Sequence, residues 1–84
     1  MSNNELIKNI DKLHTTSLGI NRIKNNLNLN DIDVINYIKK VILDKETIIY
    51  RQGKNWYSKN SNIIITINAS SYTVITAHKK KKRG

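Results

Sequence analysis

Hydrophobic residues in the first half of the chain recur at spacings of three and four, the period of an α-helix with one buried side. On this basis we predict a first helix over residues 4 to about 13. A second begins at Ser17, a residue type that caps helices, and keeps the same spacing as far as Leu27. The pattern therefore indicates two short amphipathic helices in the first thirty residues or so.

A third helix is predicted from about Asn30, and it has the clearest apolar stripe in the chain. Asp31 and Asp33 fall in its first turn, where the helix dipole favours acids, and Lys39 and Lys40 lie near its end, where cations are favoured. The stripe consists of Val34, Ile35, Ile38, Val41 and Ile42. The charge pattern and the hydrophobic pattern thus both predict this helix.

After Asp44 the hydrophobic period falls to two, and β-branched and aromatic residues dominate, as is typical of strands. Four strands are predicted, at residues 47–51, 54–58, 63–68 and 71–78. The links between them, at residues 52–53, 59–61 and 69–70, are short enough for hairpins. We therefore expect an α+β fold, in which about three N-terminal helices pack on one face of a four-stranded antiparallel β-meander and the other face stays partly open.

Alternation along the strands predicts which side chains share a face. Trp56 and Tyr57 are adjacent, so we expect one in the core and one exposed. In the last strand, strict alternation separates two sets of residues. They are Tyr72, Val74, Thr76 and His78 on one face, and Ser71, Thr73, Ile75 and Ala77 on the other.

The length of 84 residues indicates a single globular domain, which we place at residues 1–78, followed by a basic tail at 79–84. So small a chain has room for a shallow surface site rather than a deep pocket. It contains no cysteine, so disulfides and thiolate metal sites are excluded. The pattern predicts no leader peptide and no membrane-spanning run, and we expect a soluble, cytoplasmic protein.

The net charge is +9, from 15 basic and 6 acidic residues, and the tail holds a concentrated block of basic ones. A basic balance favours polyanionic partners, and a block of like charge is typical of an interaction arm. The charge of the rest of the chain has a simpler alternative explanation, a general richness in Lys, Asn and Ile. We expect RNA or another nucleic acid as the partner, and no membrane.

Two histidines stand beside hydroxyl-bearing residues. His14 precedes Thr15, Thr16 and Ser17, where hydroxyls and the free amides of a helix N-terminus favour an anion. His78 ends the last predicted strand. Histidine titrates near neutral pH, so both could transfer protons in a metal-free ribonuclease. The alternatives are a capping or packing role for His14 and a plain surface position for His78.

Several segments resemble a small bacterial family of unknown function. They are residues 13–19 (LHTTSLG) with Arg22-Ile23, residues 53–57 (GKNWY), residues 65–68 (ITIN) and residues 71–78 (SYTVITAH). More distantly, helices followed by a four-stranded meander resemble the barnase, EndoU, colicin and RelE group of metal-independent ribonucleases. That likeness implies that His14 faces early-strand cations, Arg51 and Lys54, and the hydroxyls of the last strand.

Together these features give two sets of candidate residues. The candidates for catalysis are His14, Arg51, Thr73, Thr76 and His78. The candidates for nucleic-acid binding are Thr15, Thr16, Arg22, Lys54, Tyr57, Tyr72, Lys79, Lys80, Lys81, Lys82 and Arg83. No metal-ligand spacing, glycine-rich phosphate loop or nucleophile elbow is present, so we expect no cofactor and no metal.

Three functions remain open on this evidence. One is a metal-independent endoribonuclease of toxin or phage-associated type, which cleaves RNA through attack by the 2′-hydroxyl. Another is a non-enzymatic nucleic-acid-binding module that uses the tail, Lys54 and an exposed aromatic residue. The third is a small protein that inhibits or docks on another protein. A protein partner is therefore open as well, either an antitoxin, if the chain is a toxin, or a target. The enzyme hypothesis requires that His14, Arg51 and the last-strand hydroxyls lie in one cleft.

Overall fold

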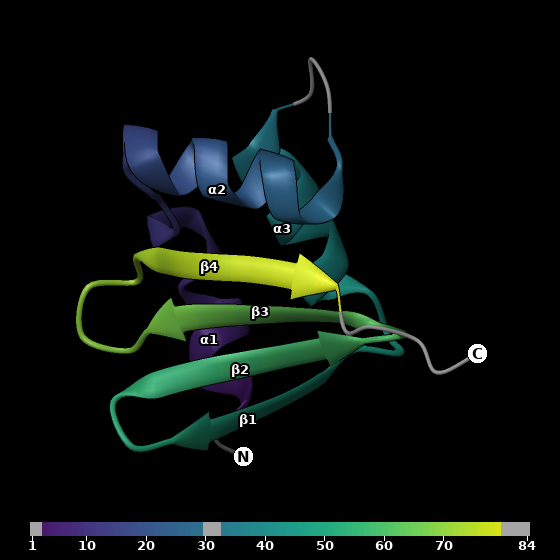
Figure 1. Cartoon of the computed structure of the whole chain (residues 1–84). Coiled ribbons are helices and arrows are strands. Elements are labelled where there is room, and N and C mark those ends of the chain that lie inside the picture. The colour runs from purple at the N-terminus through teal and green to yellow at the C-terminus, as the bar shows by residue number, and fades with distance from the viewer. Residues whose placement is uncertain (1–2, 30–32, 80–84) are drawn as a thin grey trace.

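The computed structural model describes residues 3–29 and 33–79. Its elements are α1 (Asn3–Lys8), a 3₁₀ turn η1 (Ile10–Lys12), α2 (Ser17–Leu27), α3 (Val34–Leu43), β1 (Ile48–Gln52), β2 (Asn55–Asn60), β3 (Ile63–Asn68) and β4 (Val74–Lys79). The strands form one antiparallel sheet in the order β1-β2-β3-β4 (Figure 1). The predicted α+β fold, with its helices before its strands, is confirmed.

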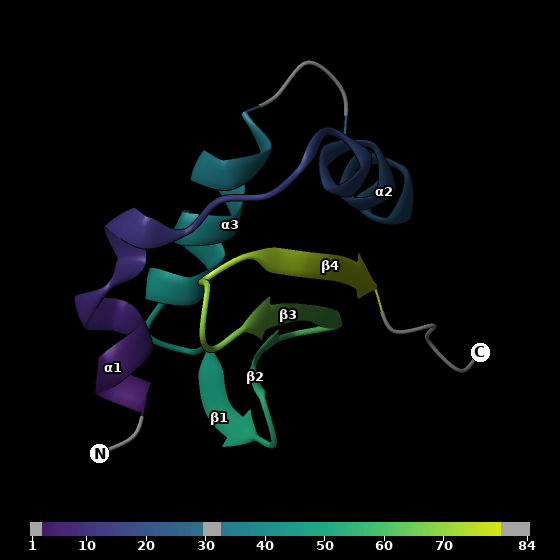
Figure 2. The same cartoon turned by 90° about the vertical axis from the view of Figure 1, so that its left-hand side faces the viewer.

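The helices occupy two positions around the sheet. Figure 1 and Figure 2 together show α1 and α3 behind one face and α2 running alongside the edge strand β4. The buried hydrophobic residues between these layers are Leu6, Leu13, Ile23, Leu27, Val34, Ile38, Ile42, Trp56, Ile65, Ile67, Val74 and Ala77. No helix in the described ranges is long and apolar enough to cross a membrane.

The strand register assigns every strand residue to one of two faces. Trp56 pairs with Ile67 and Ile67 with Val74, and these buried side chains share the face that meets α1 and α3. The opposite side, here called the open face, consists of Ile48, Tyr50, Gln52, Asn55, Tyr57, Lys59, Ile64, Thr66, Asn68, Thr76 and His78. Trp56 therefore lies in the core and Tyr57 on the open face, as adjacent strand residues should.

The helix boundaries differ from the prediction at three points. The first helix ends at Lys8, and Asn9, whose side chain donates a hydrogen bond to the Glu5 carbonyl, separates it from η1. Thr16 rather than Ser17 caps α2, because its Oγ1 accepts the Gly19 N–H at 3.0 Å. Asp33 caps α3, its Oδ1 accepting the Asn36 N–H. The predicted start at Asn30 lies outside the described residues.

Three of the four strands begin or end later than predicted, whereas β3 has the predicted bounds. Two-residue turns, Gly53-Lys54 and Ser61-Asn62, join β1 to β2 and β2 to β3, and Gly53 and Ser61 have positive φ angles of 63° and 55°. The last strand begins at Val74 instead of Ser71. The reason is that the Asn68 carboxamide accepts hydrogen bonds from the main chain of the next residues and gathers them into a turn.

The prediction of strict alternation in the last strand is wrong, because β4 contains a bulge. The register shifts between Thr66 and Ile67, which makes Ile75 the extra residue on β4. Val74 and Ala77 consequently both face the core, while Ile75 is 38% exposed. Thr76 and His78 share one face, as predicted, and the register assigns them to the open face.

Candidate functional site

His14 attaches the segment before α2 to the beginning of β4. Its N–H donates to the Tyr72 carbonyl at 3.2 Å, and its own carbonyl accepts the Val74 N–H at 2.7 Å. The side chain lies between two further partners, with Nε2 3.1 Å from Thr73 Oγ1 and Nδ1 2.9 Å from the Lys12 carbonyl. Because a carbonyl only accepts, Nδ1 carries the proton, and Nε2 of the neutral ring accepts from Thr73.

The contact continues from Thr73 into the turn that precedes β4. Thr73 Oγ1 lies 2.7 Å from Ser71 Oγ, and Ser71 Oγ lies 3.2 Å from Asn68 Oδ1. We call His14, Thr73, Ser71 and Asn68 the edge network. It contains an imidazole with a fixed tautomer beside two surface hydroxyls, which is the kind of arrangement that can support proton transfer.

The threonines after His14 have structural partners. Thr15 Oγ1 donates to the Val74 carbonyl at 2.9 Å, and Thr16 caps α2 through the Gly19 N–H. An anion at the start of α2 would bind the free amide groups there, and Thr16 already accepts a hydrogen bond from one of them. The segment acts as a clamp between α2 and β4, a role that the sequence pattern alone left open.

On the open face, two tyrosines from neighbouring strands are stacked on each other. The Tyr50 and Tyr57 ring centroids are 5.4 Å apart, with 21° between the ring planes. The register continues this row through Thr66 to Thr76. At its far end Asn26 of α2 reaches over the sheet, its Nδ2 3.5 Å from Thr76 Oγ1. The row forms an aromatic and hydroxyl-bearing strip across the whole sheet.

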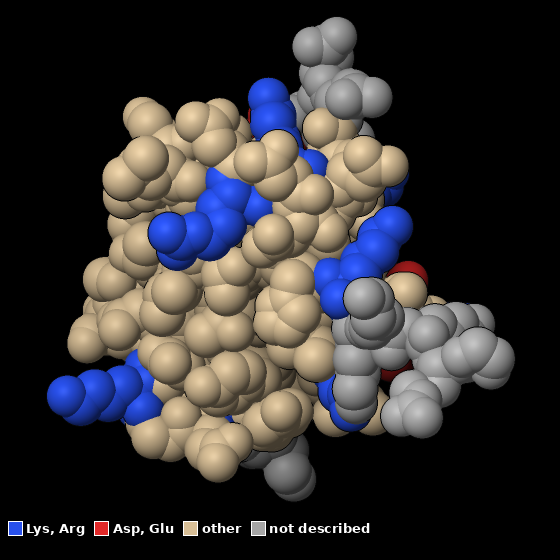
Figure 3. Space-filling model, in the orientation of Figure 1, with Lys and Arg blue, Asp and Glu red and all other residues tan. Residues whose placement is uncertain are grey.

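Charge is unevenly distributed around this face. All the acidic residues of the chain precede Thr47, and α2 contains none of them. Figure 3 looks onto the open face and shows uncharged side chains across its centre, with Lys and Arg standing around it and Asp and Glu visible only at the margins. The basic residues of α2, the strands and the first turn are Arg22, Lys24, Arg51, Lys54, Lys59 and Lys79.

The residues predicted for catalysis fall in three places. His14 and Thr73 are in contact in the edge network. Thr76 and His78 lie on the open face. Arg51 belongs to β1, where its guanidinium carbon is 5.6 Å from the Trp56 ring centroid and its Nε donates to the Gly53 carbonyl. Since β1 and β4 are the two edges of the sheet, about 14 Å separates them, and one cleft does not gather these residues.

The residues predicted for nucleic-acid binding are similarly divided. Lys54 lies in the first turn, Tyr57 on the open face, and Arg22 is exposed on α2. Tyr72 is half-buried against the core with φ of 58°, and Lys12 Nζ lies 5.7 Å from its ring centroid. Lys79 ends β4 rather than beginning a tail. The other tail residues, Lys80, Lys81, Lys82 and Arg83, lie outside the described residues.

Sequence reasoning missed Tyr50 and Lys59, which share the open face with Tyr57. A signal for Tyr50 was present, since Tyr50 and Tyr57 are equally distant from the two-residue turn Gly53-Lys54 and must therefore pair across it. Asn68 and Ser71 of the edge network had no such signal, because their roles depend on a turn that the strand pattern concealed.

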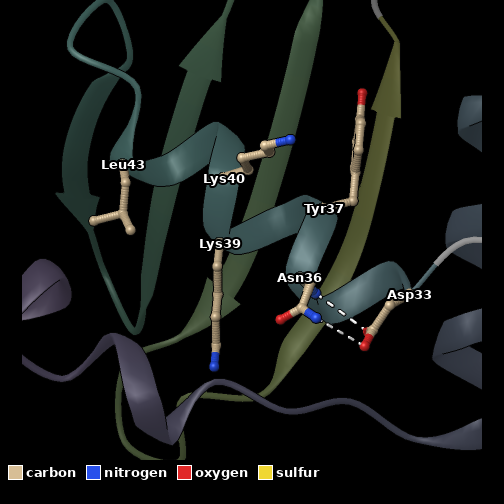
Figure 4. Close-up of a pocket in the computed structure, with 6 residues that line it drawn as sticks. All are labelled: Asp33, Asn36, Tyr37, Lys39, Lys40 and Leu43. Atoms are coloured by element: carbon tan, nitrogen blue, oxygen red, sulfur yellow. Dashed lines mark hydrogen bonds between the residues drawn. The ribbon is translucent and has the colours of Figure 1, made fainter.

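One hollow on the surface lies away from these residues. It has a volume of about 420 Å³ and runs along the outer side of α3, lined by Asp33, Asn36, Tyr37, Lys39, Lys40 and Leu43 (Figure 4). In Figure 4 the Asn36 side chain is held against Asp33, while Lys39 and Lys40 point in different directions. No candidate residue lines this hollow. Among residues 3–29 and 33–79, no three His, Asp or Glu side chains gather as a metal site requires.

Comparisons with known proteins identify a family but no activity. Searches of curated proteins and of solved structures gave no significant match. The distant likeness to the metal-independent ribonucleases therefore receives no support from them. A family model does match residues 7–78, a range that includes every segment on which the closer resemblance was based. The chain thus belongs to an uncharacterised domain family, described as "Protein of unknown function (DUF3781)".

Proposed function

We propose that this protein is a binding module for single-stranded nucleic acid and that the open face is its binding surface. The observation that carries the proposal is the stacked pair of Tyr50 and Tyr57 on a sheet whose strands contain no carboxylate. Nucleobases stack on aromatic side chains whatever their identity, because every base has a π-face. A strand of RNA or DNA could therefore lay its bases on this strip.

The polar part of the strip suits the edges of the bases. Beside the tyrosines, Thr66 and Thr76 present hydroxyls that both donate and accept hydrogen bonds. Asn26 adds a carboxamide from α2. Such groups favour unpaired bases over duplex, because a flat sheet has no helix or ribbon that could enter a groove and reach paired base edges.

Cations around the strip suit the phosphates. Lys59 lies on the open face itself, and Lys54 and Lys79 lie at opposite ends of the strands. Since the acidic residues all precede Thr47, no carboxylate of the sheet opposes a phosphate here. Phosphate contacts release counterions, so the affinity should fall linearly with the logarithm of salt concentration.

Fluorescence anisotropy with labelled single strands of mixed RNA and DNA sequence tests the proposal. Binding should weaken with salt, and Tyr50→Ala or Tyr57→Ala should raise Kd by roughly 5- to 150-fold, the loss of about 1–3 kcal/mol per stacked base. Tyr37→Ala on α3 is the matched control and should leave Kd unchanged. Absence of binding by the wild type, or equal losses in all three variants, would contradict the proposal.

A metal-independent endoribonuclease is the second candidate, and the His14–Thr73 contact favours it. In this hypothesis His14 takes the proton of a ribose 2′-hydroxyl, whose oxygen attacks the adjacent phosphorus. The bond from phosphorus to the 5′-oxygen breaks, and the 5′-oxygen takes a proton from solvent water, which leaves a cyclic phosphate and a free 5′-hydroxyl, while His14 returns its proton to the solvent. The Lys12 carbonyl leaves Nε2 as the basic nitrogen of the ring, and the 2′-hydroxyl would have to replace the Thr73 hydroxyl, which contacts Nε2 in this structure.

Incubation with mixed RNA in EDTA separates this candidate from simple binding. Cleavage should depend on His14 and should spare a DNA strand of the same sequence, which lacks the attacking hydroxyl. No cleavage by the wild type, or unchanged cleavage by His14→Ala, would exclude the enzyme while leaving the binding proposal intact.

A further inference from the structure

The two edges of the sheet differ in how far other elements cover them. The outer side of β4 is covered by α2 along its length and paired with His14 just before it begins. The outer side of β1 has no strand beside it among the described residues. Two large apolar side chains on β1 are also exposed, Ile48 at 65% and Tyr50 at 42%. An exposed apolar edge strand of this kind is a template for pairing with another chain.

The hydrogen-bonding groups that β1 offers can be deduced from its turn. Gln52 and Asn55 flank a two-residue turn, so they form a hydrogen-bonded pair, and such pairs alternate along an antiparallel ladder. Ile48 and Tyr50 therefore also bond to β2. The N–H and C=O groups of Ile49 and Arg51 point away from the sheet, and no described backbone or side chain bonds to them.

We propose that two copies of the protein pair through β1, antiparallel, about a two-fold axis that passes between their Tyr50 residues. In this register Ile49 of each copy lies opposite Arg51 of the other. All the free backbone groups of both edges then form hydrogen bonds, and the two four-stranded sheets become one continuous sheet.

Charge and bonding favour this register over its neighbours. An axis at Arg51 would place the two guanidinium groups opposite each other, and like charges directly opposite are destabilising. An axis at Ile49 would place Arg51 opposite Thr47, which precedes the strand. With the axis at Tyr50, Arg51 is the only charged residue of β1 and lies opposite an isoleucine. The partner that fits this edge is therefore a second copy of the same chain.

The pairing would also extend the open face. Tyr50 of one copy would lie directly beside Tyr50 of the other, so the tyrosines of both copies form one row across the joined sheets. The consequence for ligand length rests on the proposed function: the dimer would hold a longer single strand than one copy does. The pairing itself does not depend on nucleic acid.

A cysteine cross-link tests the register directly, because the chain has no cysteine of its own. Directly opposite residues in a non-hydrogen-bonded pair have Cα atoms about 4.5 Å apart, within the range of a disulfide. Tyr50→Cys should therefore form a disulfide-linked dimer under mild oxidation. Ile48→Cys is the control, since its counterpart would be about 13 Å away. Equal cross-linking of the two variants, or none, would overturn the proposal.

Sedimentation equilibrium of the wild type, without nucleic acid, gives a second measurement. One strand pairing is a small interface, so we expect a dimer that dissociates on dilution. Salt should favour it, because each copy carries a net charge of +9, whereas salt weakens nucleic-acid binding. Arg51→Pro removes one of the free N–H groups and should abolish the dimer. A wild type that stays monomeric while it binds nucleic acid would sink this inference alone.

Discussion

Gly19 and Thr15 occupy the same small space between α2 and β4. A β-carbon on Gly19 would collide with the Thr15 hydroxyl, which is held there by its hydrogen bond to the Val74 carbonyl. Gly19 is itself buried. The close approach of α2 to the edge strand therefore requires a residue without a side chain at this position.

Gly19→Ala should destabilise the protein, although this change inside a helix ordinarily adds about 0.5–1 kcal/mol. The methyl group must displace the Thr15 hydroxyl and leave the partly buried groups of that hydrogen bond unpaired, at a cost of about 1–3 kcal/mol, so we expect a net loss of about 1 kcal/mol. Urea unfolding measures it. In a Thr15→Ala background the same change should become neutral or stabilising, and additive effects would contradict the steric relationship.

The contact between His14 and Thr73 should be measurable as a coupling energy. His14→Ala and Thr73→Val should each lower the free energy of unfolding by about 1 kcal/mol, because each removes one partner of the same hydrogen bond. The double variant should lose less than the sum of the two. Strictly additive losses in a double-mutant cycle would mean that the contact is not formed in solution.

Ser58 is a fully buried residue whose hydroxyl has no hydrogen-bond partner in the part of the chain that the structure describes. An unsatisfied buried polar group costs free energy, so Ser58→Ala should leave stability unchanged or raise it by up to about 1 kcal/mol. Ser70→Ala, at an exposed position, is the control and should stay within about 0.5 kcal/mol of the wild type. A clear loss for Ser58→Ala would indicate a partner such as a buried water.

Lys59 should contribute to binding through a phosphate. Lys59→Gln should reduce the slope of log affinity against log salt by about 0.7, the value for one phosphate of a single strand, with a uniform loss across base sequences. Lys39→Gln on α3 makes the same change in net charge away from the open face. If both variants change the slope equally, the open face is not where the phosphates lie.

Removal of residues 80–84 tests how much the charge of the basic tail contributes to the affinity for nucleic acid. For a single strand, each of its cations that neutralises a phosphate should contribute about 0.7 to the salt slope. We expect a flatter salt dependence and weaker binding at low salt, with the losses caused by Tyr50→Ala unchanged. A truncated chain with no residual affinity would place the binding surface in the tail and not on the sheet.

The order and type of the elements followed from the sequence, because the hydrophobic period changes cleanly after Asp44. The face on which each side chain of the last strand lies could not be predicted from the sequence. The bulge at Ile75 depends on how β3 pairs with β4 and leaves no local signal. The start of that strand was also misplaced, because Asn68 organises a turn inside a segment rich in strand-forming residues.

The candidate site was predicted only in part, for a related reason. His14 and Thr73 are 59 positions apart in the sequence, so their closeness could not be read from spacing. Arg51 was grouped with them by chemical type, yet the sheet order places it on the opposite edge. Residue types led us to expect a class of partner, whereas the topology decided which of these residues lie together.

All the acidic residues precede Thr47, so charge is distributed unevenly over the molecule. The carboxylates around α1 and α3 are offset by lysines in the same layer, whereas the sheet and α2 carry cations alone. The protein therefore behaves as a dipole whose positive end is the sheet. Near any polyanion this dipole would turn the molecule before contact, so that a larger share of collisions begins with the sheet foremost and the rate of productive encounter rises.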